Sequence, residues 1–115
     1  MVKLIVYCPV ISEGPILDAL KAAGIGQQGA YDCWSIGFDV TERYRPLANA
    51  QPHSGQIGIL TEQSCRRLEF HVPKNQYLSI IQQIKAIHPY EVPAIEVTPL
   101  LYPASDSTDI TADPA

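Results

Sequence analysis

The chain has 115 residues, of which 46% are hydrophobic and 17% charged, and its formal net charge is −4 at pH 7. This length supports one modest core, and the composition is typical of a globular domain. Much of the negative charge lies near the C-terminus, at Asp106, Asp109 and Asp113, so the rest of the chain is almost neutral. Such a domain lacks the basic surface that nucleic acids or anionic membranes require, and we expect neither as a partner.

The sequence also lacks the signals of a membrane or secreted protein. No apolar run approaches the roughly 20 residues that cross a bilayer. The N-terminus has no small-residue cleavage site of a signal peptide. Cys8, Cys33 and Cys65 are too widely spaced for a disulfide framework or a Cys-x-x-Cys metal knuckle. A reduced, cytoplasmic protein is the simplest interpretation.

The chain opens with a predicted strand and a predicted helix. Residues 3–10, KLIVYCPV, are rich in β-branched and large apolar residues and predict a strand that ends at Pro9. A helix should follow, because Ser12 is a suitable N-cap and Pro15 is tolerated in a first turn. Gly24 is placed to end it as a C′ glycine.

The same strand-and-helix pattern recurs later. Residues 66–73, RRLEFHVP, alternate like a half-buried strand, and a helix begins near Asn75. At an offset of 64 positions, the spacing between Pro9 and Pro73, the apolar positions of the two segments coincide, which indicates a duplicated β-α unit. The coinciding pairs are Leu4 with Leu68, Val6 with Phe70, Ile16 with Ile80, Leu17 with Ile81, and Leu20 with Ile84.

Three further segments complete the expected order of elements. Residues 30–40 are strand-like, 41–53 read as a long polar loop, and 54–62 could supply a further short strand. Residues 93–102 predict a last strand, whose prolines limit its ladder hydrogen bonds to a sheet edge or a short piece. The order β-α-β, then β-α-β, predicts an α+β, ferredoxin-like (split βαβ) fold with two helices on one face of an antiparallel sheet. This domain should occupy residues 1–102, followed by a disordered acidic tail at 103–115.

Residues 24–29, GIGQQG, match the G-x-G-x-x-G spacing of a dinucleotide-binding turn. In such a turn the glycines follow a strand and open a helix, whose N–H groups face the pyrophosphate. Here they follow a helix and precede a strand, so the nearest helix end presents carbonyl groups. We interpret them as a helix cap and a turn with positive φ, and expect no nucleotide at this loop.

Two polar segments are candidates for a site. In HPYE, residues 88–91, His88 precedes a proline and should end the second helix. His88 and Glu91 could share a cation or another ligand; alternatively, His88 caps the helix and Tyr90 packs beside it. In RYRPLANAQPHSG, residues 43–55, the arginines could recognise a carboxylate or phosphate, although solvated loop charges are the commoner role.

The predicted strand at 30–40 would place Tyr31, Cys33 and Ser35 on one side. Cys33 could be a soft metal ligand there, but a lone strand cysteine is usually a small buried hydrophobic residue. No nucleophile elbow, H-E-x-x-H motif or P-loop stands out in the chain.

Four ordered segments together resemble the inserted domain of the Nif-three-like family, to which bacterial YqfO proteins belong. The resemblance runs from about Lys3 to Tyr102 and comprises AGIGQQGAYDCWSIGF, RYRPLANAQPHSG, FHVP and IHPYEVPAIEVTPL. The family motifs fall on Gly24, Gly26, Gly29, Tyr31, Asp32, Cys33, Arg45, Pro46, Pro52, Gly55, His88, Pro89, Tyr90, Glu91 and Pro93. Val92 departs from the family, which usually has a second glutamate there, and this weakens a hard-cation site.

The resemblance implies a PII/CutA-like fold and a homo-oligomer, either a trimer or a dimer. The ligand-binding candidates are Tyr31, Arg45, His88, Tyr90 and Glu91. The metal candidates are His88 and Glu91, with Cys33 as a weaker one. The flanking halves that form a dinuclear metal site in full-length members have no counterpart in this sequence, so we do not transfer a GTP cyclohydrolase activity.

We therefore expect a non-enzymatic, self-associating module that regulates or binds a small ligand. A first alternative is a protein that binds a divalent or transition metal ion through His88 and Glu91. A second is a hydrolase-type enzyme with its site between subunits, in which Arg45 binds an anion and His88 transfers protons.

Overall fold

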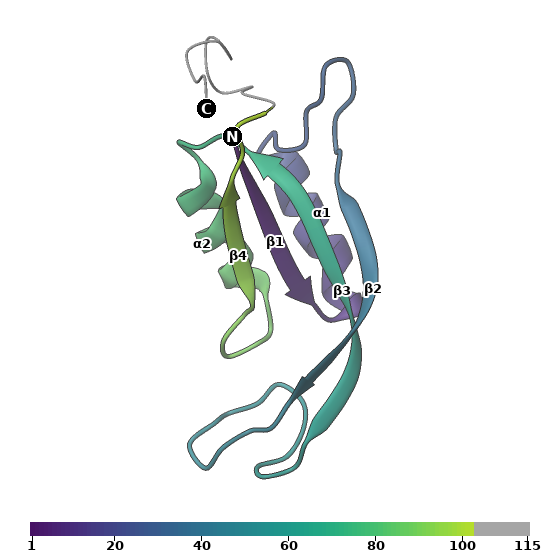
Figure 1. Cartoon of the computed structure of the whole chain (residues 1–115), viewed down its shortest axis with the longest axis vertical. Coiled ribbons are helices and arrows are strands. Elements are labelled where there is room, and N and C mark those ends of the chain that lie inside the picture. The colour runs from purple at the N-terminus through teal and green to yellow at the C-terminus, as the bar shows by residue number, and fades with distance from the viewer. Residues whose placement is uncertain (103–115) are drawn as a thin grey trace.

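Two helices pack on one face of a four-stranded antiparallel sheet in the computed structural model, which describes residues 1–102 (Figure 1). The predicted acidic tail at 103–115 lies outside the described residues. The sheet order is β2-β3-β1-β4, which confirms the ferredoxin-like fold. The elements are β1 (Val2–Cys8), the short 3-10 turn η1 (Val10–Ser12), α1 (Glu13–Ala22), β2 (Ile36–Tyr44), β3 (Thr61–Val72), α2 (Tyr77–Ile87) and β4 (Ile95–Pro99). No helix within residues 1–102 is long and apolar enough to cross a bilayer.

The core lies between the sheet and the helices. Alternate residues of the two central strands point toward the helices, and Leu4 of β1 lies opposite Phe70 of β3 and Val97 of β4. Each fully buried side chain of this kind contributes about 1.5–3 kcal/mol relative to an exposed one. The buried cluster consists of Val2, Leu4, Val6, Cys8, Ile16, Leu20, Ile25, Leu68, Phe70, Val72, Ile80 and Ile84.

The element boundaries agree with the inferred duplication. An offset of 64 carries Glu13, which begins α1, onto Tyr77, which begins α2. It also carries Cys8, the last residue of β1, onto Val72, the last residue of β3. Four of the five predicted apolar pairs are buried in both copies, and the fifth, Leu17 with Ile81, is partly buried against the same core.

The second strand begins later than the sequence predicted. Residues 30–35 are irregular, and Cys33 has a positive φ of 57°, so the expected alternation of Tyr31, Cys33 and Ser35 on one strand face is wrong. The cause is the preceding glycine-rich turn. The Trp34 N–H donates to the Gly26 carbonyl oxygen at 2.8 Å and holds this segment against the turn.

The β2–β3 hairpin is longer than predicted. Residues 41–44, expected as loop, continue β2 and pair with residues 61–64, whereas 54–60, expected in part as strand, form turns and loop. β1 ends opposite Arg66, so residues 41–44 and 61–64 have no third strand beside them. Because this part of the hairpin does not pack in the core, its residues can be polar, and the polar sequence of 41–44 did not predict a strand. The hairpin therefore extends past the end of β1 (Figure 1).

The glycine-rich turn has the structural role that its position after a helix indicated. Gly24, with a φ of 74°, follows the last turn of α1, and its N–H donates to the Lys21 carbonyl oxygen at 3.0 Å. Gly26 has a φ of 100°, and a Cβ there would lie 2.8 Å from the backbone nitrogen of Trp34. Both positions require glycine for their backbone conformation.

Candidate functional site

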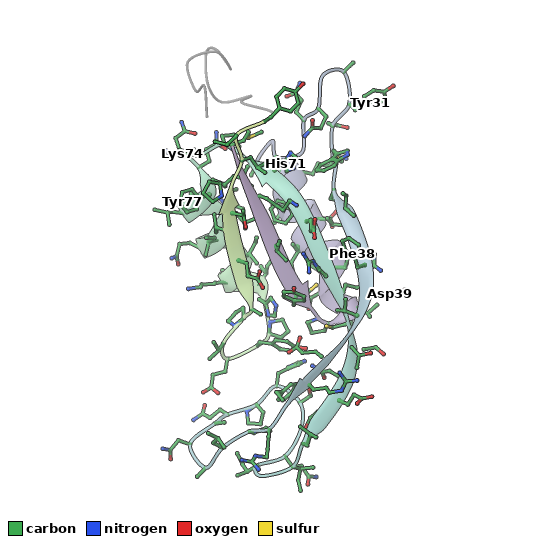
Figure 2. The ribbon with its side chains drawn as sticks, viewed as in Figure 1. Tyr31, Phe38, Asp39, His71, Lys74 and Tyr77 are labelled. Carbon is green, nitrogen blue, oxygen red and sulfur yellow. The ribbon has the colours of Figure 1, made fainter. Side chains whose placement is uncertain are left out.

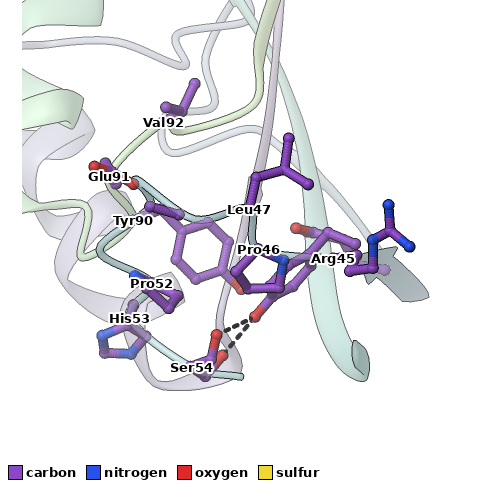
Figure 3. A pocket seen from close by; sticks show the side chains of 12 residues that line it. Arg45, Pro46, Leu47, Pro52, His53, Ser54, Tyr90, Glu91 and Val92 are labelled. Carbon is purple, nitrogen blue, oxygen red and sulfur yellow. Dashed lines mark hydrogen bonds between the residues drawn. The ribbon is translucent and has the colours of Figure 1, made fainter. Parts of the chain in front are cut away.

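A cavity of about 430 Å³ lies between the loop that joins β2 to β3 and the segment that follows α2 (Figure 3). This volume is in the range of small-molecule sites, and the lining combines apolar and aromatic side chains with a few polar groups. We call it the hairpin pocket. Its lining residues are Glu42, Tyr44, Arg45, Pro46, Leu47, Ala50, Pro52, His53, Ser54, Tyr90, Glu91 and Val92.

The structure brings together three of the five predicted ligand-binding residues. Arg45, Tyr90 and Glu91 line the hairpin pocket, although 45 residues separate the first two in sequence. His88 lies just behind it, with its ring centroid 4.8 Å from that of Tyr90. Tyr31 does not belong to this group, because it is exposed at the end of the sheet opposite the hairpin loop (Figure 2).

Cys33, the weaker metal candidate, lines a different cavity of about 210 Å³ beside the glycine-rich turn. Residues 1–102 contain no group of three or more His, Cys, Asp or Glu side chains arranged to hold a metal ion. The structure therefore does not bring Cys33 together with His88 and Glu91.

His88 ends α2 and is buried, with an extended backbone at the residue before Pro89. Its Nε2 lies 2.7 Å from the Tyr7 carbonyl oxygen, and its Nδ1 lies 3.2 Å from the backbone nitrogen of Tyr90. A carbonyl only accepts and an N–H only donates, so this pair of bonds requires the ring proton on Nε2. Both nitrogens are then occupied, and a metal ion at His88 would have to displace one of these bonds. The metal-binding role of His88 and Glu91 remains a prediction.

A chain of hydrogen bonds connects the walls of the pocket. The Ser54 hydroxyl donates to the side-chain oxygen of Gln63 at 2.8 Å, and the Gln63 amide donates to the Tyr90 hydroxyl oxygen. The Tyr44 hydroxyl lies 2.7 Å from the Ser54 hydroxyl and 2.9 Å from its carbonyl oxygen, so it donates to Ser54 (Figure 3). The chain fixes the loop after β2 to β3 and to Tyr90.

Two carboxylates in the pocket have one engaged oxygen each. Glu42 accepts a hydrogen bond from the Cys65 thiol at 3.4 Å, and burial together with this contact raises the pKa of Cys65 to about 11. Glu91 accepts from the backbone N–H of Gln51 at 3.0 Å. Burial, and then the charge of Glu42, raises the pKa of the Tyr90 hydroxyl, so this phenol is neutral at physiological pH.

Sequence reasoning missed Glu42, Tyr44, Ser54 and Gln63 as parts of the site. The first two lie in the stretch that was predicted as loop, and Gln63 lies in the unrecognised first half of β3. The signal that could have found Glu42 and Tyr44 is their spacing of two residues, which puts both on one face once β2 is extended to Tyr44.

No protein-family profile matches the chain. Similar curated proteins are named GTP cyclohydrolase 1 type 2 homolog. The one from Bacillus subtilis strain 168 is 33% identical over 98 residues, which are 85% of this chain and 26% of that protein. The one from Staphylococcus aureus strain Mu50 is 30% identical over 94 residues, which are 82% of this chain and 26% of that protein. The chain thus spans about a quarter of the length of these relatives.

Solved structures give the same relationship. A Bacillus cereus protein related to NIF3 superposes with a TM-score of 0.71 at 26% identity, covering 86% of this chain and 24% of the other. The PII-like protein CutA from Nostoc sp. PCC 7120 superposes with a TM-score of 0.64 at 18% identity, covering 87% and 81%. The latter match concerns the fold alone.

The chain is a ferredoxin-like domain of the CutA/PII-like type. Over most of its length it is homologous to one segment of the GTP cyclohydrolase 1 type 2 homologs of the NIF3 family, which confirms the resemblance seen in its motifs.

Proposed function

We propose that this chain is a self-associating module that binds a small ligand in the hairpin pocket. The observation that carries the proposal is that two distant segments, residues 42–54 and 90–92, line one cavity of about 430 Å³, with Arg45, Tyr90 and Glu91 among the lining residues. The hydrogen-bonded chain from Tyr44 to Tyr90 supports it, because a preformed pocket binds without the cost of ordering its walls.

Binding rather than catalysis is the role that these contacts favour. The hydroxyls of Tyr44 and Ser54 are both engaged in fixing the loop, and His88 orients the Tyr90 backbone from behind. Hydroxyl and imidazole groups that are engaged in hydrogen bonds within the protein give the cavity its shape and are not free to act on a substrate. The loop between β2 and β3 forms most of the pocket lining, so a bound ligand would contact this loop directly.

Self-association is supported by the sheet face opposite the helices. Phe38 and Ile36 of β2 are 44% and 41% exposed there, which is high for apolar strand residues. The same face carries the Arg67 guanidinium, which lies 5.7 Å from the Tyr7 ring centroid and 5.6 Å from that of Phe38. Aromatic and arginine side chains are those that oligomer interfaces favour.

The proposal is tested by screening small fragments with ligand-observed NMR against the wild type and Tyr90→Ala. We expect hits that lose binding in Tyr90→Ala and keep it in Tyr31→Ala, the control tyrosine at the far end of the sheet. Hits that bind both variants equally well would contradict the pocket assignment. Light scattering tests the second part, and a purely monomeric species at micromolar concentration would contradict self-association.

A further inference from the structure

The lining of the hairpin pocket also indicates what kind of ligand it takes. We propose that it selects small organic cations, namely amines or quaternary ammonium compounds with an apolar body, over anions of the same size. This inference rests on the proposed function, since it assumes that the hairpin pocket is a ligand site. Three features of the pocket carry it.

The first feature is the aromatic wall. The phenol rings of Tyr44 and Tyr90 are both half-buried in the pocket, and the His53 ring lies with its centroid 5.9 Å from that of Tyr90. The face of an aromatic ring attracts a cation, and the interaction strengthens as water is excluded. The Tyr90 oxygen accepts a hydrogen bond from Gln63, and this bond fixes the ring in place as one wall of the pocket. The Tyr90 hydroxyl is neutral.

The second feature is the charge of the pocket. Its lining contains two carboxylates, Glu42 and Glu91, and one guanidinium, that of Arg45. The known contacts of Glu42 and Glu91 use Oε2 and Oε1 respectively, so the other oxygen of each is available within the described structure. The Arg45 side chain is exposed at the rim and points away from Tyr90 and Glu91 (Figure 3). Glu91 is also exposed, at the edge of the pocket, whereas Glu42 is half-buried in its lining. Two carboxylates against one outward-pointing guanidinium leave net negative charge beside the aromatic faces.

The third feature is the apolar part of the lining. It includes Pro46, Leu47, Pro52 and Val92, and the volume of about 430 Å³ exceeds what a bare metal ion or ammonium ion fills. A ligand with an alkyl or aryl body would cover these side chains, while its charged nitrogen faces the carboxylates. This combination of an apolar body and a cationic head distinguishes the proposed ligand class from the anion that Arg45 alone would favour.

The test uses three probes that share a phenyl group: benzyltrimethylammonium, benzoate and benzyl alcohol. Because the first has the larger apolar surface, the contribution of its charge is read from the salt dependence and from the Glu→Gln variants. Each is titrated into the full chain while affinity is followed by NMR. We expect benzyltrimethylammonium to bind about tenfold tighter than the other two, the ratio that about 1.4 kcal/mol of cation–π and charge attraction provides. Rising salt should weaken only the cation.

Isosteric variants locate the effect. Glu42→Gln and Glu91→Gln should each weaken benzyltrimethylammonium severalfold and leave benzyl alcohol unchanged. Glu91 is exposed on a loop, so its variant keeps the test valid even where Glu42→Gln perturbs the fold beside Cys65. Glu96→Gln, on the edge strand β4 and outside the pocket, is the matched control and should bind all three probes as the wild type does.

The outcomes separate this inference from the proposed function. Tighter binding of benzoate that Arg45→Gln abolishes overturns the cation preference and leaves a ligand pocket. Equal affinity for all three probes also overturns the preference. If no probe binds a chain whose fold is verified by circular dichroism, both the inference and the pocket on which it rests are contradicted.

Discussion

The two β-α units differ most where their helices end. The duplication places Gly24, after α1, at the position of His88, after α2. Gly24 has a φ of 74° and turns the chain into the glycine-rich segment. His88 is extended, and its ring bonds to the Tyr7 carbonyl of the first unit and to the Tyr90 amide. Equivalent positions of the two units therefore have different roles: Gly24 forms a turn, and His88 supports the hairpin pocket.

This difference separates fold from function. The positions that repeat, such as Leu4 with Leu68 and Ile16 with Ile80, are buried in the shared core. The residues that line the hairpin pocket come from the end of β2, from the hairpin loop and from the segment after α2, all outside the repeated positions. Substitutions at the repeated core positions should then cost the most stability, and substitutions of the pocket residues should cost binding.

The largest expected effect is at a repeated position. Phe70 is fully buried, so Phe70→Ala should lower the free energy of unfolding by about 3–5 kcal/mol through lost burial and a new cavity. Phe38→Ala removes the same ring from the opposite face, where it is 44% exposed, and should cost much less. Urea denaturation measures both. Equal losses would mean that the core does not lie between the helices and the sheet.

The next effect concerns the turn of the first unit. Gly24→Ala and Gly26→Ala both force a side chain onto a positive φ, which costs roughly 1–2 kcal/mol. Only Gly26→Ala adds a contact with the Trp34 backbone, whereas a Cβ on Gly24 meets nothing within 4 Å. Thermal unfolding should show Gly26→Ala to be the more destabilised variant. The reverse order would contradict the described packing of this turn.

His88→Ala tests the equivalent point of the second unit. It leaves the Tyr7 carbonyl and the Tyr90 amide without their partner, so unfolding should become easier by about 1–3 kcal/mol. Tyr90 should also be held less firmly in the pocket lining, because its backbone loses the bond to His88, and ligand affinity should fall. His53→Ala, an exposed histidine in the same pocket, should change stability by no more than about 0.5 kcal/mol. A stability unchanged in His88→Ala would refute the supporting role.

The smallest expected effect is a pH dependence at His71. Burial first, and then the positive charges of Lys3 and the N-terminus, lower its pKa below the model-peptide value of about 6.5. The unfolded chain therefore binds the proton more readily than the folded chain. The contribution of neutral His71 to the free energy of unfolding is complete above a pH of about 6.5, and it is lost as the pH falls through the lowered native pKa. Unfolding midpoints measured across this range should fall less in His71→Gln. An identical fall in the two proteins would contradict the shift.

Much of the fold could be predicted because the repeat specifies it. Apolar spacing placed both helices, β1 and the second half of β3 within a few residues, since the repeated positions pack on the same core. The hairpin extension was missed because its strands are stabilised by pairing with each other rather than by burial, as between Glu42 and Gln63. Alternation of apolar and polar residues cannot report a strand whose half-buried face carries polar side chains such as Glu42 and Gln63.

The site was predicted only in part for a related reason. Arg45, Tyr90 and Glu91 were identified from their motifs, but their meeting depends on how far the hairpin extends and where its loop turns back. Tyr31 was included because it belongs to a motif shared with the family, yet the chain folds that motif against Gly26 at the other end of the sheet. Distances between loops are not encoded in local spacing.

The central claim is that the hairpin pocket is the ligand site of this chain. It is tested most directly by titrating benzyltrimethylammonium into uniformly ¹⁵N-labelled protein and mapping the amide chemical-shift changes. We predict that the changes concentrate at residues 42–54 and 90–92, with none at Tyr31, Cys33 or Trp34. Changes centred instead on the glycine-rich turn and the cavity beside Cys33 would contradict the account.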